Sequence, residues 1–126
     1  MRNRFYIETY GCQMNLADTE VVVGILHNSG YEVCKKPEEA DIILLNTCSV
    51  RENAENRIFG RLGNLKKFKT TKPDLIIGIL GCMAERLRND LIDNQKIVDI
   101  VVGPDEYRRL PEFIDSASAG EEGIGV

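Results

Sequence analysis

Short apolar runs alternate along this chain with longer stretches in which apolar residues recur every three or four positions. A short unbroken run is typical of a strand buried in a sheet, whereas the wider spacing is typical of a helix with one buried face. The strands predicted in this way span residues 5–9, 31–33, 41–46, 75–80 and 97–102. The helices predicted between them span about 15–29, 51–69 and 84–93, and a last one starts near Pro104.

This alternation of strands and helices predicts an α/β fold. Strands that alternate with helices form βαβ units, which place the strands parallel in one sheet with helices on both faces. Five strands favour a doubly wound, Rossmann- or flavodoxin-like sheet with the strand order 2-1-3-4-5. In that order the first, third and fourth strands are neighbours.

Single residues set several of the predicted boundaries. Asn15 is a good N-cap, with Asp18 three residues later, so the first helix is expected to begin there. Gly30 is expected to end that helix. Gly60 and Gly63 weaken the long helix over 51–69 and allow a bend or an early end in it.

The composition is that of an ordinary soluble domain. Hydrophobic residues make up 43% and charged residues 29% of the 126 positions, and the net charge of −4 gives no global attraction to nucleic acid. The start of the chain does not look like a signal peptide, and the apolar stretch around 75–80 is too short to span a bilayer. We therefore expect a cytoplasmic, monomeric domain over 1–115, followed by a linker over 116–126.

Three of the four cysteines directly follow predicted strands. Cys12, Cys48 and Cys82 come after the first, third and fourth strands, where open α/β sheets bind their ligands. In a reducing cytosol such thiols are ligands, nucleophiles or core residues before they are disulfides. Cys34 has no comparable setting, and we interpret it as a bystander.

Four functions can be compared for three thiols at one edge of the sheet: a zinc site, a thiolate enzyme, a binding module and an iron–sulfur cluster. Structural zinc usually takes closely spaced cysteine pairs, which this chain lacks. A thiolate enzyme that uses Cys12 would explain neither Cys48 nor Cys82, and a flavodoxin-like binding module with incidental cysteines would explain none of them. Three thiolates with an open fourth position best fit an iron–sulfur cluster. Asn15, Asn46 and Thr47 are candidate donors to the cluster sulfurs.

Three motifs carry a family resemblance. Tyr-Gly-Cys-Gln-Met-Asn at 10–15, Asn-Thr-Cys-Ser-Val-Arg-Glu-Asn-Ala-Glu at 46–55 and Leu-Gly-Cys-Met-Ala-Glu-Arg at 80–86 occur in that order. Together they closely resemble the amino-terminal domain of radical-SAM methylthiotransferases. The Gly-Cys-Gln-Met-Asn form resembles the MiaB-type branch, the tRNA-2-methylthio-N6-dimethylallyladenosine synthases.

The resemblance implies a role for each of the three cysteines. Cys12, Cys48 and Cys82 would hold an auxiliary [4Fe–4S] cluster that supplies or carries the sulfur for methylthiolation of adenosine C2 beside the anticodon of tRNA. S-adenosylmethionine and a second [4Fe–4S] cluster would belong to a following radical-SAM domain, with an RNA-binding domain in the same protein. The chain has no Cys-x3-Cys-x2-Cys motif. We therefore expect it to be a fragment that holds a cluster but does not catalyse the reaction alone.

Residues 51–72 carry a local excess of five positive charges. A solvated helix face explains this excess more simply than contact with RNA. Arg51 and Arg57 lie near Cys48 in the sequence, and contact with the radical-SAM domain is a third use for them.

Overall fold

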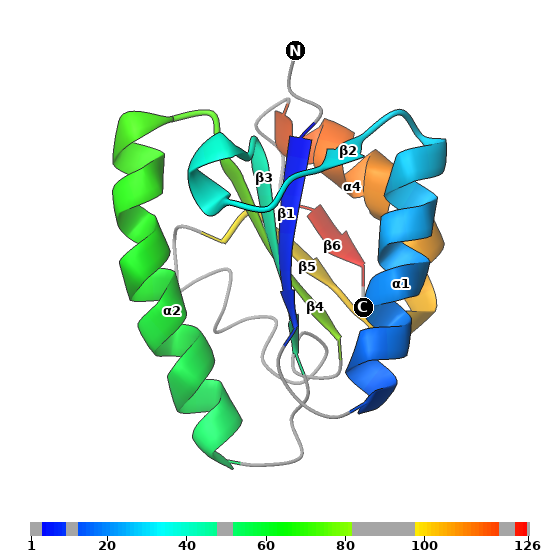
Figure 1. The fold of residues 1–126 in the computed structure, drawn as a ribbon, viewed down its shortest axis with the longest axis horizontal. Helices are drawn as coiled ribbons and strands as arrows, with labels where there is room; N and C mark the ends of the chain where they lie inside the picture. The colour runs from blue at the N-terminus through cyan, green and yellow to red at the C-terminus, as the bar shows by residue number, and fades with distance from the viewer. Residues whose placement is uncertain (1–3, 10–12, 48–51, 82–97, 119–122, 126) are drawn as a thin grey trace.

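In the described part of the chain, six parallel strands form one sheet (Figure 1). The computed structural model describes all residues except 1–3, 10–12, 48–51, 82–97, 119–122 and 126. The strands are β1 (Arg4–Thr9), β2 (Glu32–Val33), β3 (Ile42–Thr47), β4 (Ile76–Gly81), β5 (Ile100–Val102) and β6 (Gly123–Gly125). Their order across the sheet is β2-β1-β3-β4-β5-β6. The predicted order 2-1-3-4-5 is therefore confirmed, with one more strand at the far edge.

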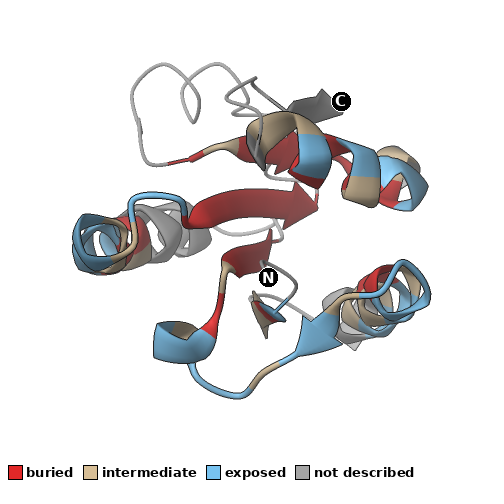
Figure 2. Cartoon of the chain, turned by 90° about the horizontal axis from the view of Figure 1, so that it is seen from above, coloured by how far each residue is buried: buried red, intermediate tan, exposed pale blue. Residues whose placement is uncertain are grey.

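Helices cover both faces of this sheet (Figure 2). Helix α1 (Gln13–Asn28), the 3-10 segment η2 (Pro104–Arg109) and helix α4 (Leu110–Ser118) lie on one face, and helix α2 (Glu52–Thr71) lies on the other. A short 3-10 turn, η1 (Pro37–Glu39), connects β2 to β3. The predicted doubly wound α/β fold is thus the one observed.

The core lies on both sides of the two central strands. Every residue of β3 and β4 is buried, as expected for strands with an unbroken apolar sequence between two helical layers. Side chains alternate between the faces: Ile43 and Leu45 pack with α2, whereas Ile42 and Leu44 pack with α1 and α4. The two central strands therefore contact the helices on both faces of the sheet.

Helix α1 begins earlier than the sequence predicted. It starts at Gln13, so Asn15 is its third residue and not its N-cap, and that prediction was wrong. The side chain of Asn15 lies outside the described residues. Gly30 ends the helix as predicted, with a φ of 94°. The amides of Gly30 and Tyr31 there donate to the carbonyls of His27 and Leu26, which satisfies the last turn.

Helix α2 runs without interruption from Glu52 to Thr71. The early end allowed by Gly60 and Gly63 does not occur, because Leu62 and Leu65 beside them are fully buried against the sheet. Tertiary packing of this face outweighs the weak helix propensity of glycine.

The remaining predictions concern the second half of the chain. The helix predicted over 84–93 lies outside the described residues, and β5 begins at Ile100 instead of residue 97. The tail predicted as a linker contains the last residues of α4 and the strand β6, which pairs with β5. That 116–126 leads to a further domain stays a prediction. Among the helices of the described residues, none has the length and apolar character needed to cross a membrane.

Candidate metal centre at the carboxyl edge of the sheet

Three neighbouring strands end side by side at the carboxyl edge of the sheet. Thr9 of β1 pairs with Asn46 of β3, and Thr47 of β3 pairs with Gly81 of β4. Adjacent strands lie about 4.8 Å apart, so the chain leaves the sheet at three closely spaced points. Figure 1 shows the arrows of β1, β3 and β4 pointing to the same end.

The three candidate cysteines follow these strand ends in the sequence. Cys12 comes three residues after the end of β1, Cys48 directly after β3 and Cys82 directly after β4. All three lie outside the described residues. Within the described part of the chain, no group of three His, Cys, Asp or Glu residues could hold a metal ion. The structure therefore brings together the three strand ends that precede these cysteines in the sequence.

A polar cluster lies on the α1 side of this edge. The Asn46 side-chain amide donates to the Thr19 hydroxyl at 2.9 Å, and the Thr19 and Thr9 hydroxyls share a hydrogen bond of 2.6 Å. Asn46 is fully buried, so a partner for its amide is required. These contacts join α1 to the ends of β1 and β3.

The end of β4 fits closely against β3. The buried Thr47 hydroxyl donates to the carbonyl of Leu80 at 2.7 Å. Gly81 has a φ of 97°, and a Cβ on it would overlap the carbonyl oxygen of Thr47 and come within 3.1 Å of Asn46 Oδ1. Only glycine fits here, because its backbone adopts positive φ freely and it has no side chain to clash. The residue before Cys82 is therefore fixed by local geometry.

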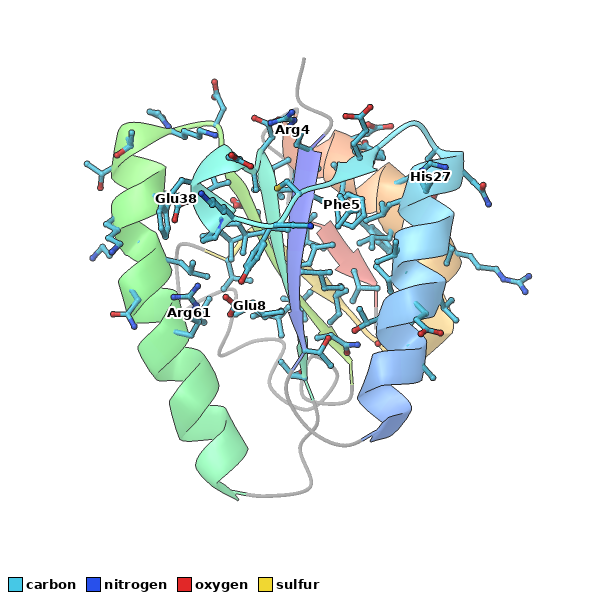
Figure 3. The ribbon with its side chains drawn as sticks, viewed as in Figure 1. Arg4, Phe5, Glu8, His27, Glu38 and Arg61 are labelled. Atoms are coloured by element: carbon cyan, nitrogen blue, oxygen red, sulfur yellow. The ribbon has the colours of Figure 1, made fainter. Side chains whose placement is uncertain are left out.

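An ion pair joins the other helical layer to β1 near the same edge. Arg61 of α2 donates its Nε to both carboxylate oxygens of Glu8, at 3.0 and 3.1 Å, and a terminal guanidinium nitrogen contacts the same carboxylate. Figure 3 shows these two side chains pointing toward one another. The Tyr6 hydroxyl also donates to Glu8, at 3.0 Å. Burial, together with this bond to a carboxylate, raises the pKa of the Tyr6 phenol.

Cys34 lies far from this edge. Its amide donates to the carbonyl of Phe5, near the start of β1, which is four residues or about 13 Å from Thr9 along an extended strand. Its thiol packs partly buried against the core, contacts the Lys36 carbonyl at 3.5 Å, and has a raised pKa because of burial. The structure therefore separates Cys34 from the strand ends that precede the other three cysteines.

Several of the positive charges of the 51–72 segment have partners inside the domain. Arg61 pairs with Glu8, Lys69 pairs with Asp99 at 2.7 Å, and Lys72 donates to a backbone carbonyl at 3.1 Å. The side chains of Arg51 and Arg57 lie outside the described residues. Internal pairing thus explains part of the charge excess without any contact to RNA.

The fold and this edge define a doubly wound α/β domain with a candidate ligand site at the carboxyl ends of its strands. The chain belongs to the family described as Uncharacterized protein family UPF0004, whose profile matches residues 4–103.

Three similar curated proteins share one name. The chain is 55% identical over 123 residues to the tRNA-2-methylthio-N(6)-dimethylallyladenosine synthase of Chloroherpeton thalassium. It is 52% identical to the proteins of the same name from Bacteroides thetaiotaomicron and Phocaeicola vulgatus. Each alignment covers 98% of this chain and 27% of the relative, so the chain spans about a quarter of their length. The predicted resemblance to tRNA methylthiotransferases is confirmed.

Proposed function

We propose that this chain is the cluster-holding part of a tRNA methylthiotransferase, in which Cys12, Cys48 and Cys82 bind a [4Fe–4S] cluster. The observation that carries the proposal is the meeting of β1, β3 and β4 at one edge, directly before the three cysteine segments. The name shared by relatives that are 52–55% identical supports the reaction class.

The local chemistry fits a bulky thiolate-bound group. Thiolates hold the irons of such clusters, and three ligands leave one iron free to bind an exogenous sulfur. Gly81 leaves no side chain at the point where β4 meets the edge, next to Cys82. When bound, the cluster would supply or carry the sulfur for methylthiolation of N6-dimethylallyladenosine at C2.

The chain's own residues would present the three thiolates and keep their segments in place. Thr47 gives its hydroxyl hydrogen to the Leu80 carbonyl, and Asn46 gives one amide hydrogen to Thr19. Both side chains therefore make hydrogen bonds to other residues of this chain. Asn46 at the end of β3 and Asn15 in the first turn of α1, three residues after Cys12, stay candidate donors to the cluster sulfurs.

The rest of the reaction would take place in parts of the enzyme beyond this chain. S-adenosylmethionine and the second [4Fe–4S] cluster would bind a radical-SAM domain, and tRNA would be held together with an RNA-binding domain. A cytoplasmic location and a monomeric state are part of this proposal. The 126-residue chain should accordingly bind S-adenosylmethionine no better than a control protein, and turnover on tRNA by this chain alone would contradict the proposal.

Anaerobic reconstitution with iron and sulfide tests the assignment of the ligands. We expect a brown protein with about four irons per chain. Replacing Cys12, Cys48 or Cys82 by Ala should remove most of the iron, whereas Cys34→Ala should retain it. A colourless wild-type protein would favour a thiolate enzyme that uses Cys12 or a flavodoxin-like binding module, and iron loss in the Cys34 variant alone would overturn the ligand set.

Hydrogen exchange shows whether the cluster binds to an already folded sheet or is needed for folding. Every residue of the largely apolar strands β3 and β4 is buried, so we expect the sheet to fold without the cluster. We expect protection to change on reconstitution in residues 11–15, 47–51 and 81–84, and hardly at all in the strands. Global loss of protection in the cluster-free protein would instead mean that folding depends on the cluster.

A further inference from the structure

The polar residue Thr19 lies in the same row of α1 as buried apolar residues. Thr19 precedes Val22 and Leu26 by three and seven positions, a spacing that puts all three on the same side of a helix. Val22 and Leu26 are fully buried against the sheet. Thr19 itself is partly buried, so its hydrogen-bond partners indicate why a polar group is there.

Thr19 bonds to the ends of two different strands. Its oxygen accepts the amide hydrogen of Asn46 at 2.9 Å, and it shares a second hydrogen bond of 2.6 Å with the hydroxyl of Thr9. Thr9 and Asn46 are themselves register partners across β1 and β3. A single hydroxyl on α1 therefore fixes the last pair of these two strands.

Asn46 extends this network to the third strand. Its Oδ1 lies 3.1 Å from the position that a Cβ on Gly81 would occupy, so its side chain reaches from Thr19 to the end of β4. Thr9, Asn46 and Gly81 precede Cys12, Cys48 and Cys82 by three, two and one residues. Two of the cysteine segments therefore follow members of this network, and the third follows a residue packed against Asn46.

We propose that Thr19 is a positioning residue that sets the separation of the three cysteine segments and thereby the retention of the cluster. This inference rests on the proposed function and deepens it. Without the hydroxyl, the buried Asn46 amide loses the hydrogen bond to Thr19, and the hydrogen bond between Thr19 and Thr9 disappears. The variant thus loses the two side-chain contacts by which Thr19 ties α1 to the ends of β1 and β3.

Three variants test the role of the hydroxyl. Thr19→Val removes it at nearly constant shape, Thr19→Ser keeps it, and Thr70→Val removes an exposed hydroxyl that bonds only the Lys66 carbonyl in the same helix, at 3.4 Å. Each protein is reconstituted anaerobically, and the rate of iron loss to a chelator and the reduction potential are measured. We expect Thr19→Val to lose iron about tenfold faster, the size of effect typical for residues that support metal ligands. Thr19→Ser and Thr70→Val should behave like wild type, including in potential.

A measurement on the cluster-free protein separates this proposal from the proposed function. In a Cys34→Ser background, a short bis-alkylating reagent should cross-link pairs of the remaining thiols, and Thr19→Val should lower the yield. A wild-type protein that neither binds iron nor cross-links would contradict the proposed function. Wild-type iron loss and cross-linking in Thr19→Val would overturn only the role of Thr19. If Thr19→Val does not fold, Thr9→Val decides: faster iron loss supports the network, and a wild-type rate overturns it.

Discussion

Replacing Gly81 by Ala is expected to destabilise the protein through two separate effects. A residue other than glycine at a φ of 97° costs about 1–3 kcal/mol in backbone strain. The new Cβ would also overlap the carbonyl oxygen of Thr47, and forcing extra volume into such a site typically costs about another 1–3 kcal/mol. The expected total is therefore about 2–6 kcal/mol.

Two other glycines supply matched controls for these effects. Gly30 has nearly the same φ, 94°, but nothing lies within 4 Å of its Cβ position, so Gly30→Ala shows the strain alone. Gly78 has an ordinary backbone, and a Cβ there would meet the flexible end of Leu44 at 2.9 Å, so Gly78→Ala shows the crowding alone. All three changes restrict the unfolded chain equally, and that contribution cancels in the comparison.

Thermal unfolding of the reduced, cluster-free proteins measures the difference. Because the entropy of unfolding scales with chain length, a loss of 1 kcal/mol in the free energy of unfolding lowers the Tm of a domain of this size by about 4 °C. We expect the Tm of Gly81→Ala to lie about 4–12 °C below that of Gly30→Ala. Equal Tm values for the two variants would refute the close fit of β4 against the Thr47 carbonyl.

Three further predictions concern the described side chains. A double-mutant cycle with Glu8→Gln and Arg61→Met, measured by urea unfolding, should give a coupling free energy of about 1–2 kcal/mol, and a value near zero would mean that the ion pair does not hold α2 to β1. The pKa of Tyr6 is raised on folding, so its contribution to stability is complete below pH 10.0, the ordinary pKa, and is lost as the pH rises further; Tyr6→Phe should therefore lose less stability than wild type above that pH. In a variant that retains only Cys34, the raised pKa of this thiol should make alkylation at pH 8 slower than for the same protein in urea, and equal rates would contradict its burial.

The parts of the fold that follow from local pattern could be predicted from the sequence. The runs at 41–46 and 75–80 have the continuous apolar composition of strands buried on both faces, and β3 and β4 are such strands. The strand order followed from the alternation of strands and helices, which allows few topologies. The convergence of the strands before Cys12, Cys48 and Cys82 followed from that order.

Other elements depend on contacts that the sequence does not display. The strand β6 is a Gly-Ile-Gly tripeptide with low strand propensity, and it exists through its pairing with β5 after the α4 crossover. Asn15 matched a capping pattern, but the pattern cannot separate an N-cap from a position inside the first turn, and α1 begins two residues earlier.

The hydrogen bonds among Thr9, Thr19 and Asn46 were also not predicted, although the sequence contains one sign of them. Thr19 lies in the same row of α1 as the buried Val22 and Leu26, where a polar side chain indicates a hydrogen-bond partner. Its partner Asn46 lies 27 residues away, so only the fold identifies it. Glu8 and Arg61, 53 residues apart, were missed for the same reason.

The most direct test of the proposed cluster is a Mössbauer spectrum of the anaerobically reconstituted chain before and after addition of hydrosulfide. A [4Fe–4S] cluster held by Cys12, Cys48 and Cys82 has one iron without a protein ligand, so about a quarter of the iron signal should respond to the added sulfur. That response should disappear with the cluster in Cys48→Ala and persist in Cys34→Ala. A spectrum without cluster iron, or one in which all irons are equivalent and unaffected by hydrosulfide, would contradict the proposal.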